Sequence, residues 1–505
     1  MAAGMAAIAC SGFSIEASAQ QAAGSSAAMP KHVVITSEQD RQRMMDQLKI
    51  TMFPSGPGPY LAATYNEATA NPYPKLPDPL MFNNGTKVTS AAQWRRRRAE
   101  IQELFDREVY GRRPTNIPKV NWTVASTTEE VVGNVPMVTR QLLGRVDNSG
   151  YPSLNVTILA SLSTPKNATS PVPVVLLFGT GGALPDGVPG TTLCVPPGQP
   201  APGAGAGAGR GRGNANPGPT PQEQIASRGW GYASVLTASI QADNGQGLTC
   251  GIIGLVNKGQ PRKLDDWGVL SAWGWGMSKV LDYFETDKAV DAKRVAVFGH
   301  SRTGKAALVA LAYDERFLTG FISSSGQSGA KLHRRKYGEA IENIAATNEY
   351  HWMAGNYLKY AGRWDMLPVD SHQLVAMVAP RPVFLSTGNG PNLNSDGTVK
   401  MMQAGDPAFV ASRGPLEQQA ESINDAWVDP KGTFLAGAGA GPVYRLLGKK
   451  DMGTTEFPKI ETGLMTGDVA FRQHAAGHIP GPNWPVFLDF AARYFETPQA
   501  VTRAR

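Results

Sequence analysis

The stretch VAVFGHSRTGKAAL, residues 295–308, has the pattern of a strand that turns sharply into a helix. Its apolar start is typical of a buried strand, and the residues after Ser301 favour a helix. A sharp strand-to-helix turn lifts a serine above the edge of a sheet and directs the first amides of the helix toward a developing oxyanion. The stretch therefore predicts a nucleophilic serine, Ser301. The alternative is a serine that only caps the helix.

The glycines around Ser301 fit a tight turn, with one displacement. Gly299 precedes the serine by two residues, whereas Thr303 stands at the usual position of the second glycine and Gly304 follows it. Such a pattern also arises by chance. Its position between a strand and a helix is what supports a nucleophilic serine.

The rest of the chain predicts a layered α/β domain. Apolar runs that are typical of buried strands occur at 172–179, 229–237, 380–388 and 443–448. Residues 268–286 have helical spacing, while residues 120–165 alternate apolar and polar side chains as antiparallel strands do. We therefore expect a three-layer sandwich, with helices on both faces of a mostly parallel central sheet.

We expect four parts along the chain. Residues 1–19 predict a signal peptide that ends at an A-x-A cleavage site, so the protein is expected to be periplasmic or secreted. An extended arm is expected at 20–75, followed by a single catalytic domain at 76–500. A Gly/Ala/Pro-rich stretch at 194–222 predicts a flexible surface insertion, and 437–442 is a shorter stretch of the same kind.

Composition excludes several classes of function. The 505 residues carry a net charge of +7, but the basic residues are scattered except for the run Arg95 to Arg98. That run lies in a helical pattern, so we interpret it as a solvated helix face and expect no nucleic-acid partner. We expect no membrane span, because no run of 18 apolar residues exists. Cys194 and Cys250 stand in loop-like contexts, and both a disulfide and two free thiols remain open.

A nucleophilic serine needs a base, and on this kind of sheet the order is serine, acid, histidine. Only seven histidines are present, and His478 lies late in the chain, in a loop before an amphipathic run. We predict His478 as the base, with His474 as its competitor four residues earlier. His300 stands beside the serine and cannot turn back to serve it, and His372 precedes an apolar run.

Six blocks of sequence resemble one enzyme family. They are LPDPLMFNNGTKVTSAAQWRRRRAEIQELFDREVYGRRP, DDWGVLSAWGWGMSKVLDYFETD, VFGHSRTGK, GAKLHRRKYGEAIENI, LPVDSHQLVAMVAPRPVF and NDAWVDPKGTFLA. From about residue 80 to 495 the chain resembles the bacterial glucuronoyl esterases of carbohydrate esterase family 15. The resemblance implies an α/β-hydrolase fold and hydrolysis of esters between (4-O-methyl-)glucuronic acid on xylan and lignin alcohols.

The resemblance also assigns roles to individual residues. Ser301 matches the nucleophile, and Arg302 matches an arginine that helps to hold the oxyanion, where a fixed cation lowers the barrier. Lys305 matches a lysine that hydrogen-bonds sugar hydroxyls. Glu339 matches a sugar-binding carboxylate, and Trp427 matches a tryptophan that contacts the uronate ring.

The sequence departs from the family at the acid of the triad. Many relatives carry Glu where this chain has Ser324, and a serine cannot stabilise an imidazolium by charge. Other bacterial relatives place the acid at the first Asp of a D-x-W-x-D-P pattern, which is Asp425 here. We therefore predict Asp425 as the acid and interpret Asp429 as structural, although the sequence leaves the choice between them open.

Three functions compete. The first is the glucuronoyl esterase, and the second is another esterase on the same scaffold, such as an acetyl-xylan or small-ester esterase. The third is an inactive polysaccharide-binding protein. No metal-binding motif occurs, so we expect neither metal nor cofactor. The expected partner is glucuronoxylan or a lignin–carbohydrate ester, and the expected state is a monomer.

Overall fold

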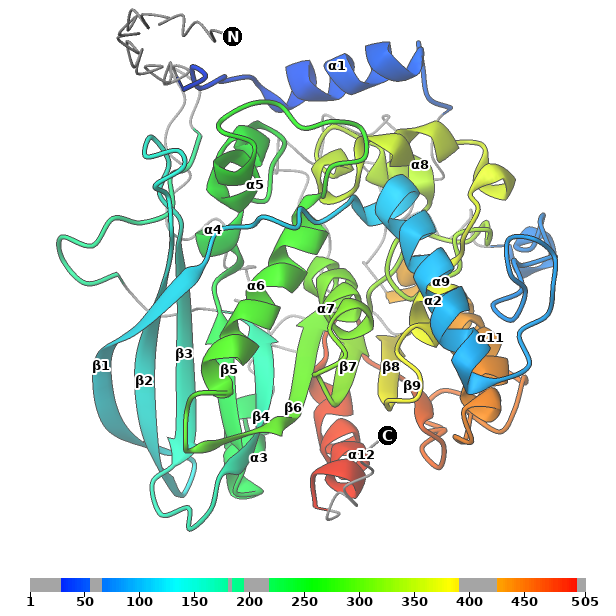
Figure 1. The fold of residues 1–505 in the computed structure, drawn as a ribbon. Helices are drawn as coiled ribbons and strands as arrows, with labels where there is room; N and C mark the ends of the chain where they lie inside the picture. The colour runs from blue at the N-terminus through cyan, green and yellow to red at the C-terminus, as the bar shows by residue number, and fades with distance from the viewer. Residues whose placement is uncertain (1–28, 55–65, 180–183, 195–217, 390–424, 497–505) are drawn as a thin grey trace, which may run out of the picture.

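The central element is a sheet whose described part has nine strands in the order β1-β2-β3-β5-β4-β6-β7-β8-β9 (Figure 1). The structure is a computed structural model, and it describes residues 29–54, 66–179, 184–194, 218–389 and 425–496. The strands are β1 (Val120–Val132), β2 (Val135–Val146), β3 (Thr157–Pro165), β4 (Val172–Phe178), β5 (Gly231–Val235), β6 (Val290–His300), β7 (Thr319–Ser323), β8 (Val383–Gly388) and β9 (Val469–His474).

The strands from β5 to β9 are parallel and buried on both faces. β4 pairs with β5 and β6, and β6, β7, β8 and β9 follow in parallel register. Along β4, Val174 and Leu176 belong to one apolar cluster, while Val175 and Leu177 belong to a second. Because successive side chains of a strand point to opposite faces, the two clusters are the two helix-covered sides of one sheet.

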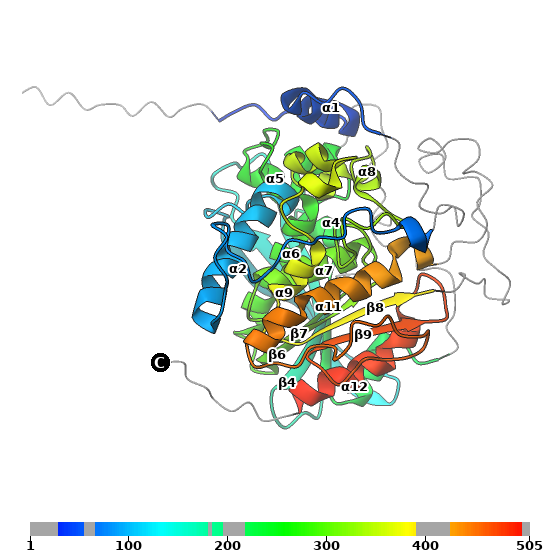
Figure 2. The same cartoon turned by 90° about the vertical axis from the view of Figure 1, so that its right-hand side faces the viewer.

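Helices cover both faces, as predicted. The longer helices are α2 (Ala91–Phe105), α6 (Val269–Phe284), α7 (Arg302–Tyr313), α11 (Pro430–Leu446) and α12 (Trp484–Phe495). Shorter ones are α3 (Pro221–Ser227), α4 (Thr237–Ile240), α5 (Gly251–Val256), α8 (Ile341–Ile344) and α9 (Ser371–Ala376). Figure 2 shows α11 and α12 on opposite sides of β8 and β9, and α12 belongs to the smaller apolar cluster. The predicted three-layer α/β-hydrolase fold is confirmed.

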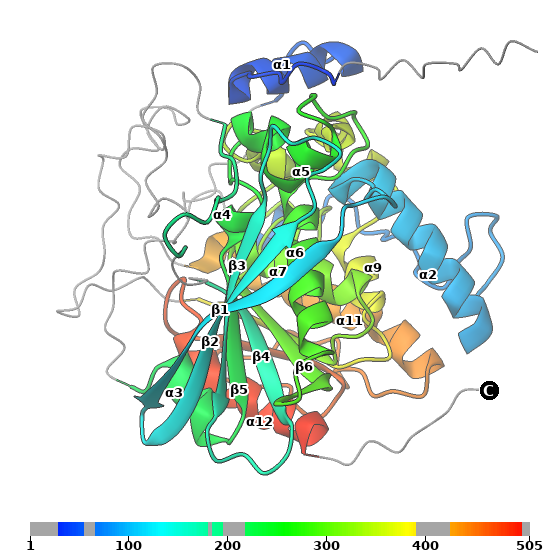
Figure 3. The same cartoon turned by 60° about the vertical axis from the view of Figure 1, so that its left-hand side comes forward.

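The residues at 120–165 form the antiparallel edge of the sheet, also as predicted. β1 pairs with β2, β2 with β3, and β3 with β5, all antiparallel. Figure 3 shows these strands fanned out at one edge of the sheet. Most of β1 is exposed, although Val120 and Trp122 at its start pack against the main apolar cluster.

Two predicted elements are wrong, and both lie in α11. Residues 437–442 were expected to form a flexible loop and 443–448 a strand, yet most of this stretch is helical. A Cβ atom on Gly437 would come within 3.0 Å of Met452 and Leu385, and one on Gly439 within 2.9 Å of His372. The glycines therefore serve close packing of α11 against β8 and α9. The strand that pairs with β8 on this side of the sheet is instead β9, at Val469–His474.

The segment expected to be an extended arm contains a helix, α1 (Ser37–Leu48). Thr36 and Gln39 form a capping box at its start, and Met44 and Met45 are buried. The Tyr350 hydroxyl donates a hydrogen bond to Ser37 O (2.9 Å), so α1 is bound to the catalytic domain. The prediction of an extended conformation is therefore wrong for this part, because two buried methionines and a capping box favour a docked helix.

Smaller turns complete the chain. The 3₁₀ turns are η2 (Glu67–Thr69), η4 (Gln246–Thr249), η5 (Tyr350–Trp352), η6 (Gly355–Tyr360), η7 (Trp364–Met366), η9 (Asp425–Val428) and η10 (Gly481–Asn483), and a π-helical turn, η3 (Asp106–Tyr110), extends α2. On α2 the arginine run is solvated at Arg95 and Arg96. Arg97 is buried instead, because its guanidinium donates to Asn83 Oδ1 (2.7 Å) and Glu100 Oε2 (2.8 Å).

Two predictions concern residues that the structure does not describe. The signal peptide at 1–19 lies outside the described residues, and so does nearly all of the insertion at 194–222. Among the helices that the structure describes, none is both long and apolar enough to cross a membrane.

The two cysteines of the described chain are paired. A disulfide joins Cys194, after the 184–193 loop, to Cys250, at the start of α5, across a sequence separation of 56 residues. Both residues are buried, and His32 of the N-terminal segment lies against both sulfur atoms. The bond therefore closes a long loop that contains β5.

We expect removal of this disulfide to destabilise the protein. Closing a loop of this length reduces the entropy of the unfolded chain, so the Cys194→Ser/Cys250→Ser variant should lose roughly 2–4 kcal/mol of unfolding free energy. Urea unfolding of this variant and of the wild type under non-reducing conditions measures the difference. Equal midpoints for the two proteins would contradict the expectation.

Candidate active site

The turn that carries Ser301 joins β6 to α7 with a strained backbone. Ser301 has φ 57° and ψ −131°, a conformation that L-residues rarely adopt. A Cβ on Gly299 would lie 2.1 Å from Thr303 O, and one on Gly304 would lie 2.8 Å from Ser323 O. Only glycine fits either position, so the displaced second glycine of the sequence pattern still allows α7 to approach β6 and β7.

The structure brings Asp425 and His478 together. His478 Nδ1 lies 2.6 Å from Asp425 Oδ1. The His478 side chain is 18% exposed, whereas Asp425 is fully buried. The His478 ring also lies 4.3 Å, centroid to centroid, from the ring of His300, the residue before Ser301. The base and acid predicted from sequence are therefore adjacent, next to the residue that precedes the predicted nucleophile.

Ser324, at the position where relatives carry Glu, contacts the same carboxylate. Its hydroxyl donates to Asp425 Oδ2 (2.5 Å), and the Gly388 N–H donates to the same oxygen (2.5 Å). The backbone of Ser324 is fixed as well, because its N–H donates to Ser386 O (2.7 Å). Ser324 has a positive φ of 43°. Ser324 thus hydrogen-bonds the carboxylate of Asp425, and it is Asp425 that contacts the ring of His478.

Asp429 has a different environment. Its Oδ2 accepts a hydrogen bond from Arg335 Nε (2.7 Å), and its Oδ1 accepts one from the Gly432 N–H (3.0 Å) at the first turn of α11. Arg335 and Asp429 thus form an ion pair, and each of the two side chains is 1% exposed. These contacts fit the structural role that the sequence suggested for Asp429.

The competing histidines are engaged elsewhere. His474 is buried, and its Nε2 lies 2.8 Å from Ile479 O. His372 contacts Pro77 O through Nε2 (2.8 Å). Burial and the nearby charge of His478 hold the pKa of His300 well below its usual value, and its Nδ1 contacts the Ser323 hydroxyl (3.1 Å). Among these histidines, only His478 contacts a carboxylate of the residues that the structure describes.

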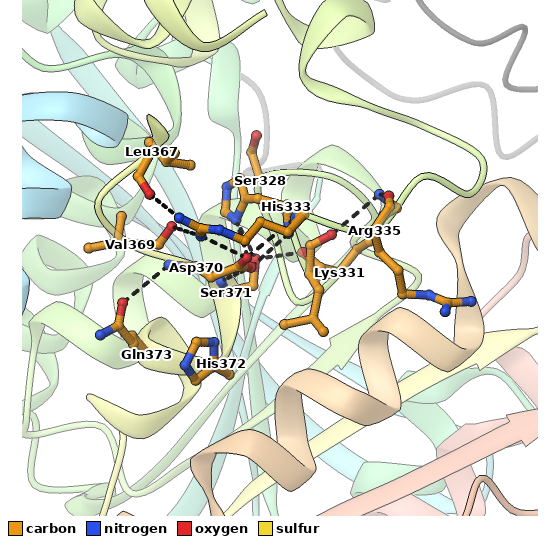
Figure 4. Close-up of polar contacts among 12 residues, drawn as sticks. Ser328, Lys331, His333, Arg335, Leu367, Val369, Asp370, Ser371, His372 and Gln373 are labelled. Atoms are coloured by element: carbon orange, nitrogen blue, oxygen red, sulfur yellow. Dashed lines mark hydrogen bonds and ion pairs between the residues drawn. The ribbon is translucent and has the colours of Figure 1, made fainter. Parts of the chain in front are cut away.

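A second group of serine, histidine and aspartate lies at the start of α9 (Figure 4). Ser371 Oγ lies 3.0 Å from His333 Nδ1, and Asp370 accepts hydrogen bonds from the His333 N–H (2.7 Å) and from Arg334 Nη1 (3.1 Å). Ser371, His333 and Asp370 are at most 1% exposed, so no substrate reaches them. Their contacts fix the loop at 331–335 onto α9, which is a structural role.

Arg302 is held by an aspartate that the sequence did not single out. Its Nη1 lies 2.7 Å from Asp243 Oδ2, and its guanidinium lies 5.6 Å from the centroid of the Trp352 ring. The Arg302 side chain is 55% exposed. Asp243 follows β5, at the same edge of the sheet as Ser301. Asp243 stands three residues beyond α4, and no local pattern in the sequence distinguished it.

Lys305 and Glu339 form a buried ion pair. Lys305 Nζ lies 2.9 Å from Glu339 Oε2 and also donates to Ser325 O (2.8 Å) and Gln327 O (2.6 Å). An ammonium has three donors, so these contacts match its full capacity. A sugar hydroxyl that binds Lys305 must therefore replace one of them.

The aromatic residue Trp427 links this pair to the histidine. The Trp427 carbonyl accepts a hydrogen bond from the Glu339 N–H (2.8 Å), and its ring lies 4.9 Å from the His478 ring. A further carboxylate, Glu349, has one buried oxygen with no hydrogen-bond partner among the described residues. Burial, with the charge of Glu339, raises the pKa of Glu349 to about 8. Nothing in the sequence pattern distinguished Glu349.

Comparison with known proteins identifies the family. A family model described as fungal glucuronyl esterase matches residues 262–414. A curated carbohydrate esterase from an unknown prokaryotic organism is 30% identical over 85% of this chain and 91% of its own. The 4-O-methyl-glucuronoyl methylesterase of Podospora anserina is 26% identical over 73% of this chain and 66% of its own.

A solved structure agrees with these relatives. The CE15 glucuronoyl esterase from Teredinibacter turnerae is 37% identical and matches with a TM-score of 0.74, over 91% of this chain and 100% of its own. The chain belongs to the glucuronoyl esterases of carbohydrate esterase family 15.

Proposed function

We propose that the protein hydrolyses esters of glucuronic and 4-O-methyl-glucuronic acid, such as those that join glucuronoxylan to lignin alcohols. One observation carries the chemistry: the 2.6 Å contact between His478 Nδ1 and Asp425 Oδ1, beside the strained turn of Ser301. Asp425 orients the ring through Nδ1, and we propose that Nε2 accepts the serine proton. Ser301, His478 and Asp425 are the proposed triad.

The reaction follows from these positions. His478 removes the proton of Ser301 as Oγ attacks the ester carbonyl, which forms a tetrahedral oxyanion. We propose that Arg302 and the first amides of α7 stabilise this charge. The intermediate collapses as His478 protonates the leaving alcohol, which leaves the uronate bound to Ser301 as an ester. Water, deprotonated by His478, then releases glucuronate and restores the serine.

The proposed sugar-binding side chains lie close to His478, whose ring is 4.9 Å from the Trp427 ring. Glu339 is proposed to accept sugar hydroxyls, and Trp427 to contact the uronate ring. The ion pair with Lys305 and the hydrogen bond from the Gln327 N–H (2.8 Å) fix Oε2 of Glu339. We propose that Lys305 hydrogen-bonds a sugar hydroxyl, as the family resemblance implies. We propose that the lysine also fixes the Glu339 carboxylate.

We further propose that the protein is exported to the periplasm or secreted. The Cys194–Cys250 disulfide supports this, since disulfides persist in oxidising compartments, and so does the A-x-A pattern at residues 17–19. A large ester polymer is accessible to an enzyme only outside the cytoplasm. The expected monomeric state stays a prediction.

The proposed activity is tested with matched esters. Benzyl glucuronate should be cleaved with a much higher kcat/KM than benzyl galacturonate, and acetylated xylan should release little acetate. Activity on p-nitrophenyl acetate and acetylated xylan without activity on benzyl glucuronate would favour the second candidate, another esterase on this scaffold. No hydrolysis of any ester would favour the inactive binding protein.

We expect Ser301→Ala to abolish turnover while the fold persists. The members of a triad act as a unit, so the loss on benzyl glucuronate should be several orders of magnitude. Steady-state kinetics measure the loss, and circular dichroism shows whether the variant is folded. Residual activity within about tenfold of the wild type would exclude Ser301 as the nucleophile.

The two aspartates should separate in their effects. Asp425→Asn should lower kcat by about 10²- to 10⁴-fold, because the imidazolium loses its charge partner. Asp429→Asn breaks a buried ion pair with Arg335 and should instead cost roughly 3–5 kcal/mol of stability. Kinetics at a temperature where both variants are folded, together with thermal unfolding, distinguish the two. The reverse pattern would show that Asp429 is the acid.

Ser324→Ala should have a smaller effect on turnover. The substitution removes one of the two hydrogen bonds to Asp425 Oδ2, which is worth about 1–2 kcal/mol, so kcat should fall roughly 5- to 30-fold. Ser278→Ala, which removes a serine hydroxyl within α6, is the matched control. A kcat for Ser324→Ala equal to that of the control would contradict a role for this hydroxyl in holding Asp425.

A further inference from the structure

Arg302 can stabilise an oxyanion only if its guanidinium is fixed before the charge develops. Preorganised donors lower the barrier because they need no rearrangement during the reaction. More than half of the Arg302 side chain is exposed, and an exposed arginine samples many rotamers. A second group must therefore hold this guanidinium in place.

The contacts of Arg302 identify that group. Arg302 Nη1 lies 2.7 Å from Asp243 Oδ2, and the face of the Trp352 ring lies 5.6 Å from the guanidinium carbon. The carboxylate fixes one amino group of the planar fork, and the ring limits movement out of the plane. These two contacts together restrict the direction in which the remaining donors point.

Asp243 is itself held by two donors on η5. Its Oδ1 lies 2.9 Å from His351 Nε2 and accepts a hydrogen bond from Trp352 Nε1 (2.6 Å). Because a carboxylate only accepts hydrogen bonds, His351 Nε2 carries the hydrogen. Burial raises the pKa of Asp243, but the bond from His351 and the charge of Arg302 outweigh it, so the pKa stays well below its usual value.

The segment that supplies these donors is anchored to the N-terminal helix. Tyr350 precedes His351 and donates to Ser37 O (2.9 Å) and to Asp40 Oδ2 (3.1 Å) on α1. A Cβ on Gly245 would lie 2.0 Å from the Tyr350 hydroxyl, so the Asp243 loop and η5 pack in direct contact. The carboxylate thus has a rigid support on both sides.

We propose that Asp243 is the positioning residue of Arg302: it fixes the guanidinium beside Ser301 so that the remaining donors face the oxyanion. The inference rests on the proposed function, in which Arg302 stabilises that charge. In this proposal Asp243 acts only through the arginine. Its effect must therefore depend on the presence of Arg302.

A double-mutant cycle tests this dependence. In the wild-type background, Asp243→Asn should lower kcat about 10- to 100-fold, a part of the full cost of an oxyanion donor, with KM changed less than about threefold. In an Arg302→Ala background the same substitution should change kcat less than about twofold. Asp489→Ala, which removes the carboxylate paired with Arg228 on the surface, is the control expected to leave kcat unchanged.

A second variant covers the case in which Asp243→Asn does not fold. Trp352→Phe keeps a ring beside Arg302 but removes the Nε1–H that holds Asp243, so kcat should fall by about 3- to 10-fold, again only when Arg302 is present. Equal losses in both backgrounds, a change confined to KM, or a wild-type kcat for Asp243→Asn would overturn the proposal.

The choice of substrate separates this inference from the proposed function. The cycle is measured on benzyl glucuronate and also on p-nitrophenyl acetate, because every ester forms its oxyanion at the same place. Failure of the wild type on benzyl glucuronate alone would contradict the proposed substrate. A cycle without coupling on p-nitrophenyl acetate would contradict the role of Asp243 whatever the natural ester is.

Discussion

The close approach of α7 to β6 and β7 is the constraint on which the site depends. Two glycines permit it, since a methyl group at Gly299 or Gly304 would collide with the backbone. The approach forces Ser301 into a left-handed conformation, which costs of order 1–3 kcal/mol. The buried sheet around the turn offsets this cost. Ser301 therefore lies at the edge of the sheet, at the end of β6.

The parallel order of the strands then collects the remaining groups. Ser301 follows β6, Ser324 follows β7, the Gly388 N–H ends β8, and His478 lies in the loop after β9. Carboxyl ends of parallel strands meet at one edge, so four neighbouring strands each deliver one part of the site. Asp425 joins three of them, because its carboxylate contacts Ser324, Gly388 and His478.

The sequence predicted the sheet, the turn at Ser301 and the pairing of His478 with Asp425, because each has a local pattern or a family motif. It failed at 437–448, where glycines that look like a loop serve helix packing against β8 and α9, a contact that only the tertiary structure creates. It also missed Asp243 and Glu349. Asp243 matters because it contacts Arg302. Glu349 matters because its buried carboxylate oxygen lies near Glu339. Neither neighbour is adjacent in sequence, so no local pattern indicates these contacts.

The proposed chemistry requires that His478 and Asp425 activate Ser301 at this turn. The most direct measurement is covalent labelling with a serine-hydrolase phosphonate probe, followed by peptide mass spectrometry. We expect one adduct per chain, on Ser301, formed much more slowly when Asp425 is replaced by Asn. An adduct on another residue, or labelling of Ser301 at an unchanged rate in that variant, would contradict that requirement.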